Sequence, residues 1–508
     1  MKNEFLTKHQ SKIQGVLRCY DRVVIKGTLH SVGHAGAMTN LLYRKDTPLK
    51  DFASFIAPYR NQLHQNAEQI AQQEGIKIEF IRKAKKIRKE DLVAQHLSKR
   101  PVTEGLVCIL SAMEQCQNYE YRYDRNTGRS YLQMTSGKCL HYYFYFKDPE
   151  LGLCYMRVPT WCPFRLQFYF NGHNWLAKQL DKAQIGYELV DNALTYIEDF
   201  EKAQAIADNF EVRKLHHRLD DYANLYCPVA RKLCHIGYHW SIMQVEYATD
   251  IVFKDDKSLG AIYDHLLNTI VHAVQPDDIA KFLGRKYLHG KNNLEIETSC
   301  KQVRHHMRRI KHRMGASSVK MYDKYSKVLR IETTTNDTTE FYHYRSVDHR
   351  DGTKTSKVAP VKKSIYSLKA LVDILGGCNN RYLKYIAAFD DPSMGEKRLQ
   401  KLSAPSKNNQ RTYKGFNFFD SDDEQILKAI ACGDFLIHGF RNKQLKQKLG
   451  NKSTGQVSRI IKRLRVKGLV KKVKNAYKYF LTTLGQKAIA TALNFKELIC
   501  LQQLSYQL

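Results

Sequence analysis

The chain has 508 residues, with 82 Lys and Arg against 50 Asp and Glu, and a formal net charge of +32. That excess of cations favours phosphate-rich partners, because each neutralised phosphate releases a counterion and adds binding free energy. No run of about 18 apolar residues and no apolar signal core occurs, so we expect a cytoplasmic protein with no membrane segment. The length predicts about two to four domains.

Missing motifs exclude several further classes of protein. The 12 cysteines are scattered and form no CxxC pair, which predicts reduced thiols rather than a disulfide framework or a zinc ribbon. Neither a GxxxxGK[ST] loop nor a GxGxxG loop is present, which argues against an ATPase or a dinucleotide enzyme.

Residues 1–100 are predicted to form a mainly helical N-terminal region with one early strand at 20–29. Apolar residues at helical spacing over 51–74, followed by Gly75 as a C-cap, predict the longest helix here. The basic block at 82–89 suits either a phosphate backbone or a solvated helix start.

Residues 101–345 are predicted to form an α+β core body with a mixed, mostly antiparallel sheet and helices. Alternating patterns separated by turn signals predict a succession of short strands. The aromatic run at 141–146 is either sheet core or a surface on which unpaired bases stack. The expected strands of this region, in chain order, are 105–110, 119–123, 130–134, 140–146, 153–158, 164–170 and 241–253.

A basic β-hairpin near residue 320 is the main candidate for a functional element. Residues 318–322 and 328–334 alternate apolar with polar, and 323–326 suits a turn. The cations that precede the hairpin predict a nucleic-acid surface. They are Arg308, Arg309, Lys311 and Arg313.

Acidic residues in or next to predicted strands offer a metal site. Converging carboxylates hold Mg²⁺ in phosphoryl-transfer sites, because hard oxygen ligands position the metal against the scissile phosphate. The alternative is structural, since Glu332 can pair with Arg330 or Lys320 across the hairpin. The candidate ligands are Asp21, Asp250 and Glu332, with Glu246 beside them on the strand at 241–253.

The Tyr-Asp-Lys strand at 322–324, followed by Arg-Ile-Glu at 330–332, resembles rolling-circle replication initiators. The strand carboxylates resemble those of acidic-triad transposases and nucleases. Both resemblances imply metal-dependent cutting or transfer of DNA strands, and Tyr322 is then a candidate nucleophile. The chain departs from the initiators because no predicted strand carries a histidine–hydrophobic–histidine motif.

Residues 346–415 are predicted to be a linker and helical connector, with polar segments at 348–360 and 403–414. Residues 416–508 then show helices at 422–431, 441–449 and 453–466, strands at 469–473 and 477–482, and a last helix. This order resembles a winged helix-turn-helix domain, and the segment YKYFLTTLGQKAI resembles the MarR-type branch.

The winged-helix resemblance implies duplex DNA as a partner. The third helix would place polar side chains against base edges and cations against phosphates, and the hairpin after it would be the wing. The candidate DNA-binding residues here are Gln456, Ser458, Arg459, Lys462, Arg463, Arg465, Lys471 and Lys474.

The whole chain also resembles a group of large bacterial proteins that end in a MarR-like domain, through segments 15–29, 141–180, 246–253 and 318–333. Two hypotheses follow. In the first, the protein is a regulator-like DNA-binding protein whose basic body contacts nucleic acid without catalysis. In the second, it is a metal-dependent strand-processing enzyme of a mobile element. The sequence leaves the oligomeric state open, a homo-oligomer included.

Overall fold

The computed structural model describes residues 3–82, 87–285, 295–302, 308–390, 393–432, 435, 438–473, 477–494, 496 and 500. The chain divides into two compact units, Met1–Asp390 and Asp391–Leu508. Each unit is described by itself below. Among the described residues, no helix is both long enough and apolar enough to cross a membrane.

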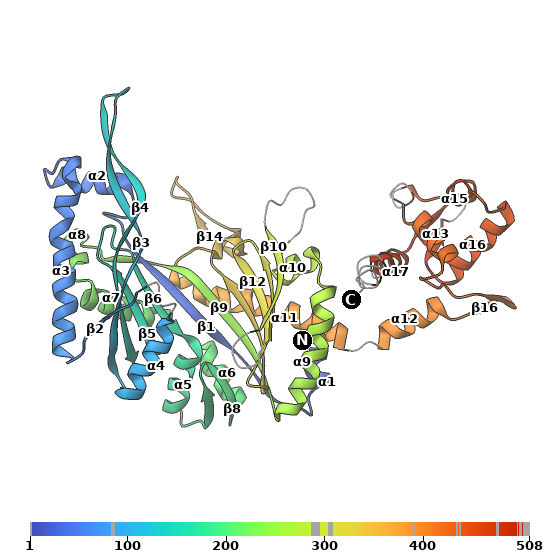
Figure 1. Ribbon diagram of the computed structural model, residues 1–508, viewed down its shortest axis with the longest axis horizontal. Helices are drawn as coiled ribbons and strands as arrows, with labels where there is room; N and C mark the ends of the chain where they lie inside the picture. The colour runs from blue at the N-terminus through green and yellow to red at the C-terminus, as the bar shows by residue number, and fades with distance from the viewer. Residues whose placement is uncertain are drawn as a thin grey trace. The chain divides into compact units, whose positions relative to one another are not determined.

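An eleven-stranded sheet runs through the large unit in the order β10-β11-β12-β13-β9-β1-β6-β5-β4-β3-β2 (Figure 1). Every neighbouring pair is antiparallel except β2 and β3, which are parallel. The predicted α+β class with a mixed, mostly antiparallel sheet is therefore confirmed. In sheet order the strands are β10 Ile296–Gln302, β11 Arg308–Met314, β12 Ser317–Lys324, β13 Val328–Thr335, β9 Tyr238–Phe253, β1 Ile13–Leu29, β6 Leu166–Asn171, β5 Gly152–Pro159, β4 Arg129–Asp148, β3 Gly105–Asp124 and β2 Ile78–Phe80.

Most helices cover one face of this sheet, which we call the helix-covered face. On α11, Asn379 donates to the backbone oxygen of Tyr247 at 2.9 Å and accepts from Thr333 at 2.7 Å. Further along, the Phe144 ring stacks on Tyr226 with centroids 4.4 Å apart. On the opposite face, Leu92 and Val93 of the helix at residues 89–99 pack with Tyr143 and Tyr145. The helices of the large unit are α1 Glu4–Lys8, α2 Ala35–Arg44, α3 Phe52–Gln73, α4 Lys89–Lys99, α5 Gly172–Lys182, α6 Phe200–Asp208, α7 Val212–Tyr226, α8 Val229–Leu233, α9 Asp256–Ala273, α10 Pro276–Phe282 and α11 Leu368–Asp390.

Two segments differ from the sequence-based expectation. Residues 1–100 are mainly helical as expected, but their strand β1 is 17 residues long and lies at the middle of the sheet, so they are part of the same compact unit as the body. The expected linker at 348–360 folds largely into strands, because β14 Tyr342–Asp348 pairs with β15 Lys354–Pro360 as a separate hairpin. A second small hairpin joins β7 Tyr187–Val190 to β8 Ala193–Ile197.

The small unit packs helices against a short hairpin around the buried side chains of Phe416, Leu427, Leu445, Ile461 and Leu481. Backbone hydrogen bonds between Phe440 and Tyr479 add a third extended segment to the hairpin. The elements are α12 Ser393–Ser403, β16 Ser406–Asn408, β17 Arg411–Tyr413, α13 Ser421–Ile430, α15 Asn442–Leu449, α16 Thr454–Val466, β18 Val470–Lys472, β19 Tyr479–Leu481 and α17 Thr483–Asn494.

Candidate functional site: a buried charge cluster and two basic surfaces

Charged side chains from β1, β9, β12 and β13 meet on the face of the sheet opposite the helix-covered face, which we call the polar face. Strand register explains the meeting, since Arg330 lies opposite Asp250 and Lys320 lies opposite Glu332. Alternate residues of a strand point to the same face, so Glu332 follows Arg330 there. Asp21 joins them from β1, whose pairing with β9 shifts register between Tyr20 and Val23.

Arg330 is the centre of the first half of this cluster and is fully buried. Its Nε and Nη2 donate to the two carboxylate oxygens of Asp250, each at 2.6 Å, and its Nη1 donates to Asp21 Oδ2 at 3.0 Å. Burial is the largest single influence and would raise the pKa of Asp250, but the charges and hydrogen bonds of Arg330 and His173 together outweigh it and lower the pKa to about 2. Both oxygens of Asp250 are thus committed to a two-pronged ion pair.

Two side chains from outside the hairpin, those of His173 and Asn192, complete this half. The His173 Nε2 of α5 lies 2.9 Å from Asp250 Oδ2 and 2.8 Å from Arg330 Nη2. Asn192 donates to Asp21 Oδ1 at 2.8 Å and accepts a hydrogen bond from Lys324. Sequence reasoning missed His173 and Asn192, because no local spacing connects them to β1, β9 or β13.

Lys320 is the centre of the second half. Its Nζ donates to Glu246 Oε1 at 2.9 Å and to Glu332 Oε1 at 2.6 Å. The side chains of Lys320 and Glu246 are each 12% exposed, whereas that of Glu332 is 1% exposed, so the cluster reaches solvent on the Glu246 side. Burial, followed by the charge of Glu332, raises the pKa of Glu246 to about 7.

Tyr322 donates its hydroxyl to Glu332 Oε2 at 2.6 Å. Burial and the neighbouring Glu332 charge hold the pKa of this phenol well above its ordinary value. A nucleophilic tyrosine needs the opposite shift, so this geometry makes Tyr322 a hydrogen-bond donor to Glu332.

Three of the acids offer metal-ligand geometry, but not the three expected. Oxygens of Asp21, Glu246 and Glu332 all lie within 4.8 Å of one another, as the ligands of one ion would. Asp250 is not in this group, and Arg330 and His173 engage both of its oxygens. Arg330 and Asn192 engage both oxygens of Asp21 as well. Hard carboxylate oxygens suit Mg²⁺. The Lys320 ammonium, bonded to both glutamates, already supplies a positive charge there, so a metal would have to displace it.

A cationic surface adjoins the cluster on β11. Arg309, Lys311 and Arg313 lie opposite Tyr322, Lys320 and Ser318, which places them on the polar face. Burial, followed by the charges of Lys320, Arg309 and Arg313, lowers the pKa of Lys311. This is the signature of cations packed together with too little counter-charge.

Arg308 is the exception among the predicted hairpin cations. It precedes Arg309 on the strand and so points to the other face, where its guanidinium pairs with Asp264 of α9. Arg308 is therefore removed from the cationic surface of β11.

In the small unit, α16 exposes most of the predicted DNA-binding residues, and Arg463 is turned the other way. Arg463 bonds to both carboxylate oxygens of Asp423, at 2.7 and 2.8 Å, and lies 3.8 Å over the Phe416 ring. It therefore has a structural role inside the unit. Lys474 lies outside the described residues. The exposed predicted residues are Gln456, Ser458, Arg459, Lys462, Arg465 and Lys471.

The aromatic run at 141–146 is buried throughout, so its rings belong to the core rather than to a base-stacking surface. On the polar face Tyr143 donates to Glu114 at 2.7 Å, and Arg157 and Lys89 pair with the same carboxylate. This second charged network lies at the β3–β5 end of the polar face, separate from the cluster around Arg330 and Lys320.

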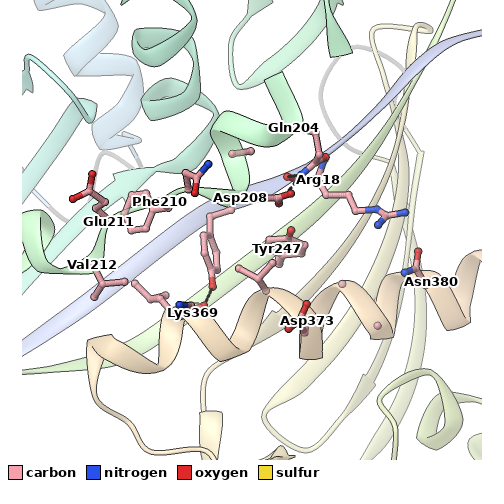
Figure 2. Close-up of a pocket in the computed structure, with 17 residues that line it drawn as sticks. Arg18, Gln204, Asp208, Phe210, Glu211, Val212, Tyr247, Lys369, Asp373 and Asn380 are labelled. Atoms are coloured by element: carbon pink, nitrogen blue, oxygen red, sulfur yellow. Dashed lines mark hydrogen bonds between the residues drawn. The ribbon is translucent and has the colours of Figure 1, made fainter. Parts of the chain in front are cut away.

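A cavity of about 660 Å³ lies on the helix-covered face, between β1, β9, α6 and α11. Tyr20 and Tyr247 line it from the sheet, and Asp208 and Asp373 lie on either side of Tyr247 (Figure 2). Gly376 of α11 leaves room there, since an added Cβ would lie 3.3 Å from the Tyr247 ring. No sequence pattern indicated this recess.

Comparison with protein-family models, with curated proteins and with solved structures finds no match to this chain.

Proposed function

We propose that the protein is a cytoplasmic, regulator-like DNA-binding protein whose small unit docks on duplex DNA as a winged helix. The observation that carries this proposal is the surface of α16. Val457, Ile461 and Leu464 anchor the helix in the core. The opposite side therefore faces solvent in a fixed orientation, as a recognition helix requires.

The cations on that exposed side are available to phosphates. Arg459, Lys462 and Arg465 are exposed, and within the described part of the chain none of them forms an ion pair with an acid. Lys471 and Lys472 are exposed on β18, the first strand of the following hairpin, where a wing would contact the backbone. Fixed, unpaired cations on adjacent elements favour a polyanion over a neutral partner.

The large unit supports the same partner through the cationic surface of β11. Arg309, Lys311 and Arg313 crowd together there with Lys320. Phosphates would relieve their mutual repulsion, so the basic body would add contacts to those of α16.

Duplex-binding titrations at several salt concentrations test the proposal. We expect Arg459→Ala, Lys462→Ala and Arg465→Ala each to weaken binding and to reduce the slope of log K against log salt by about 0.9 for each phosphate that is no longer neutralised. Lys487→Ala, an exposed cation on α17, is the matched control and should leave both unchanged. Wild-type affinity and slope in all three α16 variants would overturn the proposal.

A second candidate function is metal-dependent processing of DNA strands, as in a mobile element. The convergence of Asp21, Glu246 and Glu332 favours it, because those oxygens could hold Mg²⁺ against a phosphate once Lys320 moves aside. A nicking assay with Mg²⁺ or Mn²⁺ should then show cleavage that Glu246→Gln and Glu332→Gln abolish and that Asp208→Asn, outside the cluster, retains. Absence of cleavage by the wild type, or cleavage by all variants, would overturn it.

A further inference from the structure

We propose that the β14–β15 hairpin is a binding arm for single-stranded DNA. This inference rests on the proposed nucleic-acid function and adds a second class of substrate to it. The arm, Tyr342–Pro360, forms a sheet of its own, and its base is fixed to the body. Val361 donates its backbone N–H to Phe341 at 2.8 Å, and Ile242 of β9 donates to Lys363 at 2.6 Å. The arm is thus a defined projection of the large unit (Figure 1).

One face of the arm displays aromatic rings. Tyr342 and Tyr344 alternate on β14 and are 61% and 70% exposed, and Val358, directly opposite Tyr344, is 66% exposed. Pro360 lies opposite Tyr342 and extends the same patch. A contiguous exposed apolar patch of this kind marks a binding surface.

The spacing of the two tyrosines suits unpaired bases. Residues two apart on a strand lie about 7 Å apart along it, about twice the distance between stacked base planes. A base stacked on each ring, or one base between them, therefore fits the arm. Bases in a duplex already stack on one another, so aromatic platforms select single strands.

The positive charge of the arm favours a polyanion as its partner. The arm contains four Lys or Arg and two Asp, and Lys362 and Lys363 follow directly after it. Arg345 and Lys357 lie directly opposite each other across the two strands. Like charges in that position destabilise a hairpin. A phosphate between them removes the repulsion, so the arm combines a stacking face with a phosphate-binding face.

Acids neutralise only part of this charge, and they pair with other cations than Arg345 and Lys357. Lys363, for example, pairs with Asp337 at 3.3 Å. Asp348 pairs with Lys354 at 3.5 Å and with Lys362 at 3.8 Å. Asp351 accepts hydrogen bonds from Thr353 within the turn. Lys357 has no acidic partner among the described residues, which leaves its charge for a ligand.

Fluorescence anisotropy with the full chain, an oligo-dT strand and a duplex of equal length tests the arm. We expect Tyr342→Ala and Tyr344→Ala each to weaken oligo-dT binding about tenfold, the effect of losing one base–ring stack. Duplex affinity should not change, and Tyr344→Phe, which keeps the ring, should bind as the wild type does. Tyr43→Ala removes an equally exposed ring on α2 and is the matched control.

Three results would overturn the proposal that the arm binds single-stranded DNA. They are no oligo-dT binding by the wild type, equal losses of affinity for both DNAs in the tyrosine variants, or a change of oligomeric state in Tyr344→Ala. The last would make the patch an interface between copies of the chain. Failure of the small-unit proposal looks different, since Arg459→Ala would then leave duplex binding intact while the tyrosine variants still bind the single strand less tightly.

Discussion

Replacing Arg330 by methionine removes the cation that holds Asp21 and Asp250 in the interior. Methionine roughly fills the volume of the arginine stem, so the principal loss is electrostatic. Two carboxylates that are 4% and 1% exposed as whole residues then lack their guanidinium partner. Removing one member of a buried ion pair typically costs about 3–5 kcal/mol, because the remaining charge stays desolvated. We expect about 4 kcal/mol for this variant on the same ground.

That loss of unfolding free energy corresponds to a lower melting temperature of the large unit. Unfolding entropy near 60 °C is about 2.1 cal/mol/K per residue, so a unit of about 390 residues should lose about 5 °C for about 4 kcal/mol. Calorimetry measures this directly and can separate the transition of the large unit from that of the small one.

The pH dependence of the stability difference between the wild type and Arg330→Met tests this reasoning. In the wild type the pKa of Asp250 is lowered to about 2, so its stabilising contribution is present above about pH 4 and lost as the pH falls further. In Arg330→Met the unpaired carboxyls protonate more readily, so the gap between the two proteins should narrow from about pH 7 to about pH 4. A loss below about 1 kcal/mol, or a gap that does not change with pH, would refute the reasoning.

Three other variants probe the remaining charge pairs. Lys320→Met should destabilise the large unit by about 3 kcal/mol at neutral pH, because two glutamates lose their cation. If the glutamates bind metal, Mn²⁺ should restore part of the lost stability. A melting temperature of this variant that does not respond to Mn²⁺ contradicts the metal site. In the wild type the raised pKa of Glu246, about 7, gives stability that is present at acid pH and lost as the pH rises through about 7. Glu246→Gln should flatten that decline, and parallel melting curves at about pH 5 and about pH 8 would count against it. Arg463→Ala should cost the small unit about 3 kcal/mol by leaving Asp423 unpaired, whereas normal melting with weaker DNA binding would make Arg463 a DNA-binding residue.

The sequence by itself determined the local elements, because each is encoded by nearby residues. Alternation over 328–334 predicted β13, and the structure has it at Val328–Thr335. The turn expected at 323–326 contains Tyr325 and Ser326 with positive φ angles. The apolar spacing after Ser453 likewise predicted α16, whose capping box joins Ser453 to Gln456.

Only the tertiary structure decided which strands meet and which charges pair. Asp21 and Arg330 are 309 positions apart, and their ion pair depends on β1, β9 and β13 lying side by side in the sheet. Short-range patterns carry no information about that order, so the sequence predicted Asp250 rather than Glu246 as a metal ligand, and only the register pairs Asp250 with Arg330. The sequence could not predict that the Arg463 side chain points into the small unit for the same reason, since its partner Asp423 lies on another helix.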